Sequence, residues 1–227
     1  MIGLRSLSLS YGAISALSSI DLEIEAGERV ALVGPSGSGK TTLLRLVAGL
    51  ENPSAGQIVL SGRTATPWLP PSERGVAMVF QRPALWPHLS VQGNVAFGLP
   101  ARTEGSGRRV AHLLNRLGLA ALAGRRPHQL SGGEAQRVAI ARALAPASPI
   151  LLLDEPFSDL DAAFVERVAD VVQEEADITG ATVLLAAHDL VAAAEVCSQV
   201  AVLRGGRLHH GPGPWAGTGV LPEGWAR

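Results

Sequence analysis

The hydrophobic positions along the chain change between strand-like and helix-like spacing. Near the N-terminus, leucines and isoleucines recur at about every second position around residues 4–9 and 20–24, which is typical of half-buried strands. Short apolar runs predict further strands at residues 30–33, 57–60, 76–80, 150–153, 182–187 and 200–203. A helix is expected from Lys40, where leucines recur every three or four positions, to an end near Gly49 to Pro53. Strands alternating with helices predict an α/β fold with a mostly parallel sheet that is covered on both faces.

The pattern changes between residues 81 and 130, where proline, glycine and arginine interrupt short helical stretches at about residues 91–97 and 110–117. We interpret this part as an inserted helical lobe. A further helix is expected to begin near Ser131, with apolar residues on one face as far as Leu144. After Leu208 the chain is rich in glycine and proline, so residues 209–227 are expected to form a short tail.

Composition narrows the class of protein. The chain has 227 residues, of which 47% are hydrophobic and 17% charged, so a packed core is expected. The formal net charge of −1 argues against a general nucleic-acid binder. No secretory signal is recognised, and the apolar runs are too short to span a bilayer, so any action at a membrane requires partners. The one cysteine, Cys197, is expected in the core.

A phosphate-binding loop is predicted by the segment Gly34-Pro-Ser-Gly-Ser-Gly-Lys-Thr41, which fits the pattern G-x-x-x-x-G-K-[ST] between a strand and a helix. Its backbone N–H groups can surround phosphate oxygens, Lys40 can reach the β and γ phosphates, and Thr41 can bind Mg²⁺. The alternative is a structural glycine-rich turn. The predicted nucleotide contacts here are Gly34, Pro35, Ser36, Gly37, Ser38, Gly39, Lys40, Thr41 and Thr42.

Two acids end the buried strand Ile150-Leu-Leu-Leu-Asp-Glu155. Asp154 at the tip of the strand can hold Mg²⁺, and Glu155 can orient or deprotonate an attacking water. The alternative is that both acids merely cap the following helix.

A second phosphate-binding device is predicted at Leu130-Ser-Gly-Gly-Glu-Ala-Gln-Arg137. Ser131 and Glu134 form a capping box, which accounts for these two residues without any ligand. It does not account for Gly132 and Gly133, because glycine in the first turn of a helix is unfavourable by about 1 kcal/mol relative to alanine. Bare N–H groups at a helix start bind anions.

With these three motifs in their order along the chain, at residues 34–41, 130–137 and 150–155, the sequence resembles the ATP-binding subunits of ATP-binding-cassette (ABC) transporters over about residues 2 to 208. The resemblance implies a P-loop NTPase core with a mostly parallel sheet, an N-terminal antiparallel β subdomain and an α-helical subdomain inserted at about residues 82–145. Residues 1–208 would then be a single ABC ATPase domain and residues 209–227 a short tail, with no regulatory domain.

The resemblance also implies roles for residues that the motifs alone do not assign. Tyr11 would stack on adenine, although it could also be an ordinary aromatic at a strand end. Gln81 would sense the γ-phosphate and Mg²⁺, and His188 would contact the γ-phosphate, unless His188 is simply a polar residue before a helix. Ser131, Gly132, Gly133, Gln136 and Asp161 would contact nucleotide across a dimer interface. The implied metal ligands are Thr41, Gln81 and Asp154, and the implied ligands of the protein are ATP and Mg²⁺.

The implied partners are a second ATPase subunit in a head-to-tail homodimer and integral membrane permease subunits that dock near Gln81–Phe97. The docking residues could instead be a local core of the helical lobe. A solute-binding protein would act indirectly, no nucleic acid is expected, and the location would be the cytoplasmic face of the bacterial inner membrane. The function favoured is an ATPase that powers a solute importer. An ABC exporter or lipid-extraction ATPase, a non-transport ABC protein and, more remotely, a P-loop kinase stay open.

Overall fold

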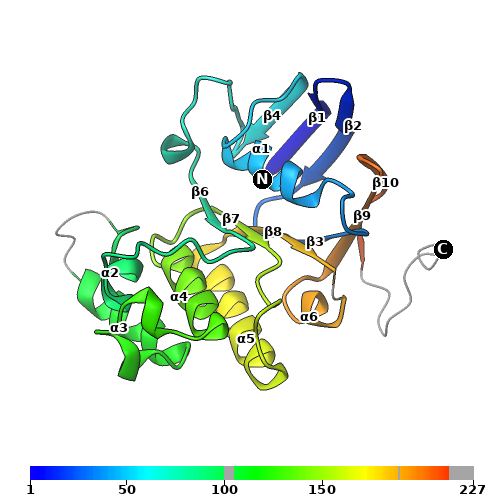
Figure 1. Ribbon diagram of the computed structural model, residues 1–227. Coiled ribbons are helices and arrows are strands. Elements are labelled where there is room, and N and C mark those ends of the chain that lie inside the picture. The colour runs from blue at the N-terminus through cyan, green and yellow to red at the C-terminus, as the bar shows by residue number, and fades with distance from the viewer. Residues whose placement is uncertain (100–104, 189, 215–227) are drawn as a thin grey trace.

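The computed structural model describes residues 1–99, 105–188 and 190–214 (Figure 1). The helices are α1 (Lys40–Ala48), α2 (Val91–Ala96), α3 (Ser106–Arg116), α4 (Gly132–Leu144), α5 (Ala162–Thr179) and α6 (Leu190–Ala194). The strands are β1 (Ile2–Tyr11), β2 (Ile14–Ile24), β3 (Arg29–Val33), β4 (Ala55–Leu60), β5 (Arg63–Thr64), β6 (Val76–Val79), β7 (Ile150–Asp154), β8 (Thr182–Ala187), β9 (Gln199–Arg204) and β10 (Arg207–Pro214). None of these helices is both long and apolar enough to cross a membrane.

The strands form two sheets. The first is antiparallel, with the order β2-β1-β4-β5, and the second has the order β10-β9-β3-β8-β7-β6. In the second sheet β9, β3, β8, β7 and β6 are parallel, and β10 joins β9 in antiparallel pairing at the edge. The carboxyl ends of the parallel strands therefore meet at one edge, where ligands of such sheets usually bind.

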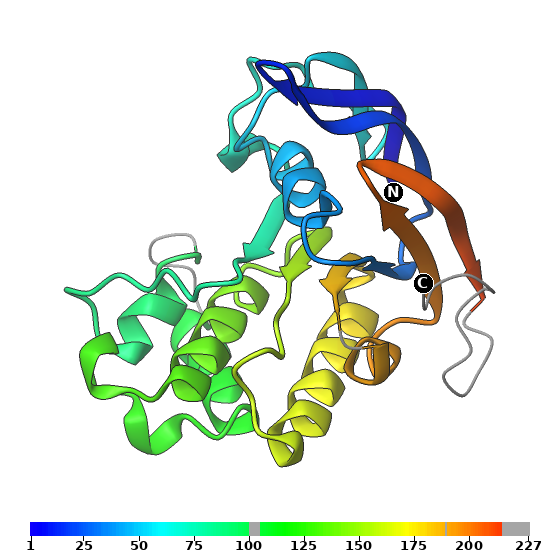
Figure 2. The same cartoon turned by 45° about the vertical axis from the view of Figure 1, so that its right-hand side comes forward.

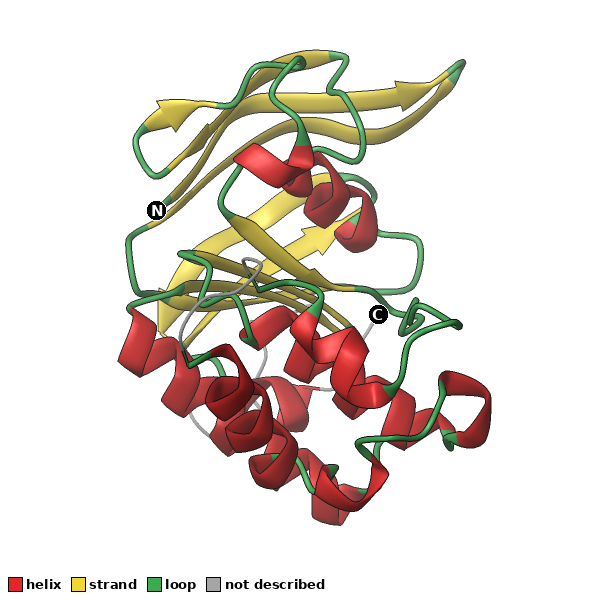
Figure 3. Ribbon diagram, turned by 90° about the vertical axis from the view of Figure 1, so that its left-hand side faces the viewer, coloured by secondary structure: helices red, strands yellow, loops and turns green. Residues whose placement is uncertain are grey.

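Helix α1 lies between the two sheets, and α4, α5 and α6 cover the opposite face of the six-stranded sheet (Figures 1 and 3). This layering follows from the alternation of side chains along the central strands. Leu32, Leu152 and Leu184 face α1 and the antiparallel sheet, whereas Val33, Leu153 and Leu185 belong to the cluster beneath, with the helices. The central sheet thus separates two hydrophobic cores.

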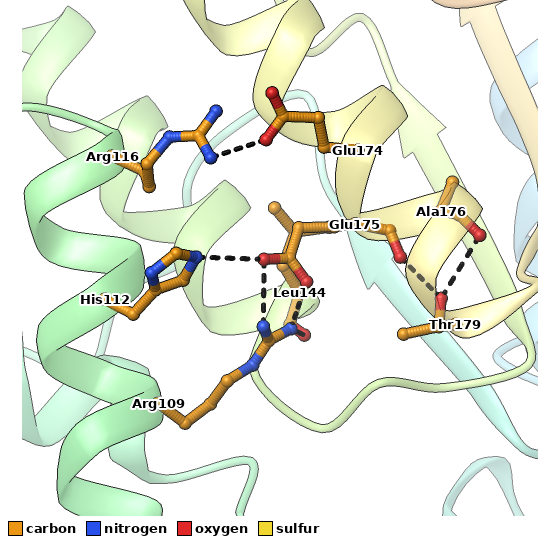
Figure 4. Close-up of polar contacts among 8 residues, drawn as sticks. All are labelled: Arg109, His112, Arg116, Leu144, Glu174, Glu175, Ala176 and Thr179. Carbon is orange, nitrogen blue, oxygen red and sulfur yellow. Dashed lines mark hydrogen bonds and ion pairs between the residues drawn. The ribbon is translucent and has the colours of Figure 1, made fainter.

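Helices α2, α3 and α4 form the helical lobe, and polar contacts join α3 to α5 (Figure 4). The guanidinium of Arg109 makes two contacts with the carboxylate of Glu175 and also donates to the carbonyl oxygen of Leu144 at 2.9 Å. His112 Nε2 lies 3.6 Å from the same carboxylate, and Arg116 pairs with Glu174. Glu175 is almost fully buried, so this cluster fixes the lobe against the sheet's helical layer.

The structure confirms the predicted alternation of strands and helices, but it differs from the prediction at the C-terminal end. Helix α1 ends at Gly49 in a left-handed backbone conformation, as expected for a glycine C-cap. Strand β10 continues to Pro214, so residues 209–214 are not tail; they form an edge strand, which lies beside β2 (Figure 2). An edge position tolerates Pro212 because its missing N–H is not needed by a further strand. Cys197 is buried, as predicted.

Candidate active site

The phosphate-binding loop lies between β3 and α1, at the carboxyl edge of the parallel strands. Gly37 and Gly39 have φ angles of 77° and 104°, which only glycine adopts readily, so the sequence folds here into a tight turn before the helix. A Cβ atom on Gly34 would collide with the carbonyl oxygen of Leu203 in β9. The loop is therefore pressed against the neighbouring strand end.

Lys40 is held inside this loop. Its Nζ donates to the carbonyl oxygens of Gly34 at 2.7 Å and Pro35 at 3.3 Å, and the residue is only 6% exposed. Burial lowers the pKa of Lys40, and the nearby carboxylates of Glu155 and Asp154 act in the opposite direction. A buried lysine beside the exposed residues Pro35, Ser36 and Gly37 is suited to binding a polyphosphate.

Thr41 and Asp154 form the predicted metal-binding pair. Thr41 Oγ1 donates to Asp154 Oδ1 at 3.0 Å, which joins the start of α1 to the tip of β7. Asp154 is 2% exposed, and this burial raises its pKa, while the hydrogen bond from Thr41 opposes the shift. Among the described residues no three His, Cys, Asp or Glu side chains cluster as a metal cage. A hydroxyl and one carboxylate nevertheless fit Mg²⁺, which commonly takes its other ligands from phosphates and water.

Glu155 stands at the meeting point of two further polar residues. Gln81 Nε2 donates to Glu155 Oε2 at 3.3 Å, and His188 Nδ1 lies 3.2 Å from the same oxygen. The backbone of Glu155 has φ of 48°, which is unfavourable for a glutamate, and its N–H donates to Ala186 in β8 at 2.9 Å. This turn directs the carboxylate toward Gln81 and His188, and a strained, fixed carboxylate beside a phosphate loop is suited to act as a general base.

An open cleft of about 510 Å³ lies at the phosphate loop. It is lined by Ile14, Ser15, Ala16, Ser36, Gly37, Ser38, Gly39, Lys40, Thr41, Thr42, Gln81, Glu155, Gly205 and Gly206. Of the predicted residues, Ser36 to Thr42, Gln81 and Glu155 therefore come together at this cleft, whereas Gly34, Pro35, Asp154 and His188 do not line it.

Five lining residues were not predicted, namely Ile14 to Ala16 and the two glycines of the β9–β10 turn. Gly206 N–H donates to Ser38 O at 3.0 Å, and Ser18 N–H donates to Gly206 O at 2.7 Å. The turn thus joins the phosphate loop to the β1–β2 hairpin. The GG pair at 205–206 was a signal of a tight turn, but only the fold brings it to the cleft.

Tyr11, expected to stack on adenine, ends β1 and does not line the cleft; its hydroxyl donates to Glu51. That hydrogen bond raises the pKa of Tyr11. The neighbouring Ile14, 72% exposed, lines the cleft instead. Stacking by Tyr11 stays a prediction.

The residues of the second predicted phosphate-binding device, Leu130 to Arg137, contribute nothing to the cleft lining. The hydroxyl of Ser131 accepts from Glu134 N–H at 3.2 Å and the carboxylate of Glu134 accepts from Ser131 N–H at 2.7 Å, so the predicted capping box is present. The hydrogen bond from the Ser131 N–H to the carboxylate is the main cause that lowers the pKa of Glu134. Ser131, Gly132 and Asp161 are exposed, so another molecule can reach this end of α4.

Gln136 corrects one prediction. It was expected to contact nucleotide, but it is fully buried in α4 and cannot reach a ligand in this conformation. Its Nε2 donates to the carbonyl oxygen of Pro156 at 3.2 Å. The residue therefore joins α4 to the turn that follows Glu155.

Comparison with known proteins gives consistent results. Residues 17–158 match the family described as ABC transporter. The sulfate/thiosulfate import ATP-binding protein CysA of Caulobacter vibrioides is 46% identical over 215 residues, which are 91% of this chain and 63% of that protein. The Fe(3+) ions import ATP-binding protein FbpC of Mesorhizobium japonicum is 43% identical over 209 residues, which are 90% of this chain and 58% of that protein. The chain therefore spans about three fifths of these relatives.

The fold is similar to that of solved ATP-binding cassettes. A dimeric cassette in a post-hydrolysis state, bound to ADP and Pi, superposes with a TM-score of 0.86 at 31% identity, covering 96% of this chain and 100% of that one. A second dimeric structure of a bacterial ABC transporter cassette gives a TM-score of 0.87 with the same identity and coverage.

Proposed function

Because this chain belongs to the ABC transporter family, we propose that it is the ATP-binding and ATP-hydrolysing subunit of a membrane transporter that imports a solute. The importer class is supported by the names of the relatives, which import sulfate, thiosulfate or ferric ions. In this proposal residues 1–208 form the ATPase domain, with the helical lobe at about residues 82–145 inserted in it.

The observation that carries the proposal is the convergence of Lys40, Glu155 and Gln81 on one cleft. A phosphate site without the Glu155 group would explain nucleotide binding alone. A glutamate in contact with both Gln81 and His188 supplies what hydrolysis additionally requires, which is a base beside groups that can orient water and the γ-phosphate.

The phosphate loop would hold the triphosphate, with its N–H groups and Lys40 stabilising the negative charge that develops on the phosphate oxygens. Thr41 and Asp154 would hold Mg²⁺, which neutralises phosphate charge when bound. Glu155 would take a proton from water as the water oxygen bonds to the γ-phosphorus and the bond from that phosphorus to the leaving ADP oxygen breaks. Gln81 and His188 would orient the water and the γ-phosphate.

The second phosphate-binding device is best explained by a head-to-tail homodimer. Within one chain the Ser131 end of α4 does not line the cleft, so a nucleotide between the two devices requires a second chain. Two-fold symmetry then creates two equivalent sites. The dimeric cassettes that resemble this chain support the arrangement. Asp161, exposed at the start of α5, would act across the same interface.

The membrane partner would be a permease that docks near Gln81–Phe97, with a solute-binding protein acting on the far side of the permease. Trp86 and Phe97 support a docking surface here, because their ring centroids lie 5.1 Å apart and the two residues are 42% and 60% exposed. Leu85 instead packs against the core of the lobe. The ATPase would then sit at the cytoplasmic face of the inner membrane.

The test is the substitution Glu155→Gln. It keeps the size of the side chain but removes the base, so we expect ATP hydrolysis to fall about 10²- to 10⁴-fold while ATP binding persists. Because the dimer would close on ATP without hydrolysing it, size-exclusion chromatography with ATP and Mg²⁺ should show a longer-lived dimer.

The control is Glu174→Gln, which alters an exposed glutamate in α5 and should hydrolyse ATP normally. A Glu155→Gln chain with undiminished hydrolysis would overturn the catalytic role. Isolation of the native protein in a complex that lacks any permease would count against a transporter.

A further inference from the structure

The chain segment that follows Gln81 is held by two polar side chains from different helices. Arg142 in α4 donates from Nη1 to the carbonyl oxygen of Ala84 at 2.8 Å and from Nη2 to that of Pro83 at 2.9 Å. These acceptors lie two and three residues after Gln81, so Arg142 anchors the beginning of the segment to α4.

Asn94 in α2 orders the rest of the segment. It is fully buried, its Oδ1 accepts from Trp86 N–H at 2.8 Å, and its Nδ2 donates to the carbonyl oxygens of Trp86 and Ser90 at 3.2 and 3.0 Å. Asn94 therefore stabilises the segment within its own part of the lobe. Arg142 supplies the link between the residues next to Gln81 and the helix of the Ser131 device.

The backbone at this link needs such support. Ala84 has φ of 45°, a left-handed conformation that is unfavourable for any residue with a Cβ atom. A bidentate guanidinium on two successive carbonyl groups fixes their relative orientation, which a single hydrogen bond could not do.

The surroundings of Arg142 indicate that its main role is to bind the Pro83 and Ala84 carbonyl groups. Burial lowers the pKa of Arg142, and within the described ranges no carboxylate pairs with it. Arg109 and Arg116, by contrast, each pair with a glutamate. Burying part of a guanidinium without a carboxylate partner costs free energy. The hydrogen bonds to the Pro83 and Ala84 carbonyl groups are what offsets this cost.

The same helix also holds the residue after Glu155. Gln136 donates to Pro156 O, as described above, and Gln136 and Arg142 lie less than two turns apart along α4. Helix α4 therefore fixes the backbone just after both Gln81 and Glu155, whose side chains lie 3.3 Å apart (Nε2 to Oε2).

We propose that Arg142 is a positioning residue for ATP hydrolysis, which holds the Pro83–Ala84 backbone so that the Gln81 side chain stays beside Glu155. This role rests on the proposed ATPase function. Arg142 does not line the cleft, so it acts through Gln81 and touches neither nucleotide nor water there.

The test compares the full-length chain with its Arg142→Met and Arg142→Lys variants in steady-state ATP hydrolysis. We expect Arg142→Met to lower kcat about ten- to hundredfold, as a displaced catalytic group does, with KM for ATP changed less than about twofold. Arg142→Lys should recover part of kcat, since an ammonium can bind one of the two carbonyl groups. Arg167→Met is the matched control, because Arg167 also donates to two carbonyl oxygens, those of Arg116 and Asn115, away from the cleft.

Two further measurements separate this role from a merely structural one. In a Gln81→Ala background, Arg142→Met should cause little additional loss of kcat, because Arg142 acts through the Gln81 side chain, which is already absent. Hydrogen exchange in Arg142→Met should increase at residues 84–90 and stay unchanged in β7. If Arg142→Met does not fold, Arg142→Lys carries both measurements.

A folded Arg142→Met with normal kcat, or losses that multiply fully with those of Gln81→Ala, would overturn the positioning role while leaving the ATPase intact. A wild-type chain that does not hydrolyse ATP would overturn the proposed function, and the positioning role with it.

Discussion

Lys40 shows at the scale of one residue how composition relates to chemistry. The chain has 19 basic residues of the Lys and Arg type, and Lys40 is the only lysine among them. The structure places it inside the phosphate loop, bonded to Gly34 and Pro35 and almost fully buried. A compact ammonium fits such a crowded turn, whereas a planar guanidinium requires more room and a different set of acceptors.

We therefore expect Lys40→Arg to keep the charge and the fold but to lower kcat/KM for ATP by about 10²-fold or more, because the phosphates would be displaced from their productive position. Steady-state hydrolysis measures the effect, and circular dichroism with a thermal melt confirms that the variant is folded. Near-normal turnover by Lys40→Arg would refute the link between this residue type and the reaction.

The residues of the candidate site were predictable to different degrees. Lys40 and Glu155 belong to contiguous motifs whose chemistry is readable from spacing alone. Gly206 was not predictable, because its contact with Ser38 joins positions far apart in sequence and depends on a backbone N–H, which every residue type except proline carries. Gln136 was misassigned because burial inside a helix is decided by which face packs, whereas Ser131 and Gly132 at the start of the same motif are exposed.

At the scale of elements, hydrophobic periodicity predicted several elements that bury one face or both faces. Strands β3, β7 and β8 and helices α1 and α4 were predicted from it. No element was predicted for residues 162–179, although Val165, Val168, Val172 and Ala176 recur at helical spacing in α5. Strand β10 had no such signal, because an edge strand buries little side-chain surface and so tolerates Gly and Pro.

The contact between α3 and α5 yields a prediction about stability (Figure 4). Glu175→Gln removes the carboxylate from a partly buried Arg109, so we expect a loss of about 1–3 kcal/mol in the free energy of unfolding, less than for a fully buried pair because the Arg109 side chain is 26% exposed. Urea titration of the purified chain measures the loss.

Glu174→Gln is the matched comparison, because Glu174 pairs with Arg116 on the same two helices with both side chains exposed. Its cost in the free energy of unfolding should be clearly smaller than that of Glu175→Gln, because solvent screens an exposed ion pair. Equal effects of the two substitutions would contradict the view that burial of Glu175 makes its cluster the stronger link.

At the scale of the whole molecule, the proposed dimer makes each nucleotide site depend on two chains. Gly133 must be glycine for internal packing, since a Cβ atom there would lie 2.9 Å from the carbonyl oxygen of Asp159. Gly132 is different, because its Cβ would lie 4.0 Å from the nearest atom, Cβ of Asp159. An aspartate at position 132 therefore fits the fold and favours the helix start, but it would repel phosphate.

We predict that a Lys40→Arg chain and a Gly132→Asp chain, each weakly active alone, complement one another when mixed. In a mixed head-to-tail dimer one site carries both changes and the other carries neither. Random mixing should thus restore up to about a quarter of wild-type hydrolysis, because half of the dimers are mixed and each has one intact site.

ATP hydrolysis measured against mixing ratio tests this, with each variant at twice the concentration as the control. Activity that never exceeds the sum of the two separate chains would contradict sites shared between chains.

The central sheet, finally, divides the molecule into two layers, each with its own hydrophobic core, and both cores use the same strands. Leu32, Leu152 and Leu184 belong to the core beneath the β1–β2 hairpin, while Val33, Leu153 and Leu185 belong to the core of the helical side. Replacements in one core leave the other core's packing surface untouched. The two cores can therefore be repacked separately, but the helical side is not independent of the nucleotide chemistry, because α4 fixes the backbone just after Gln81 and Glu155.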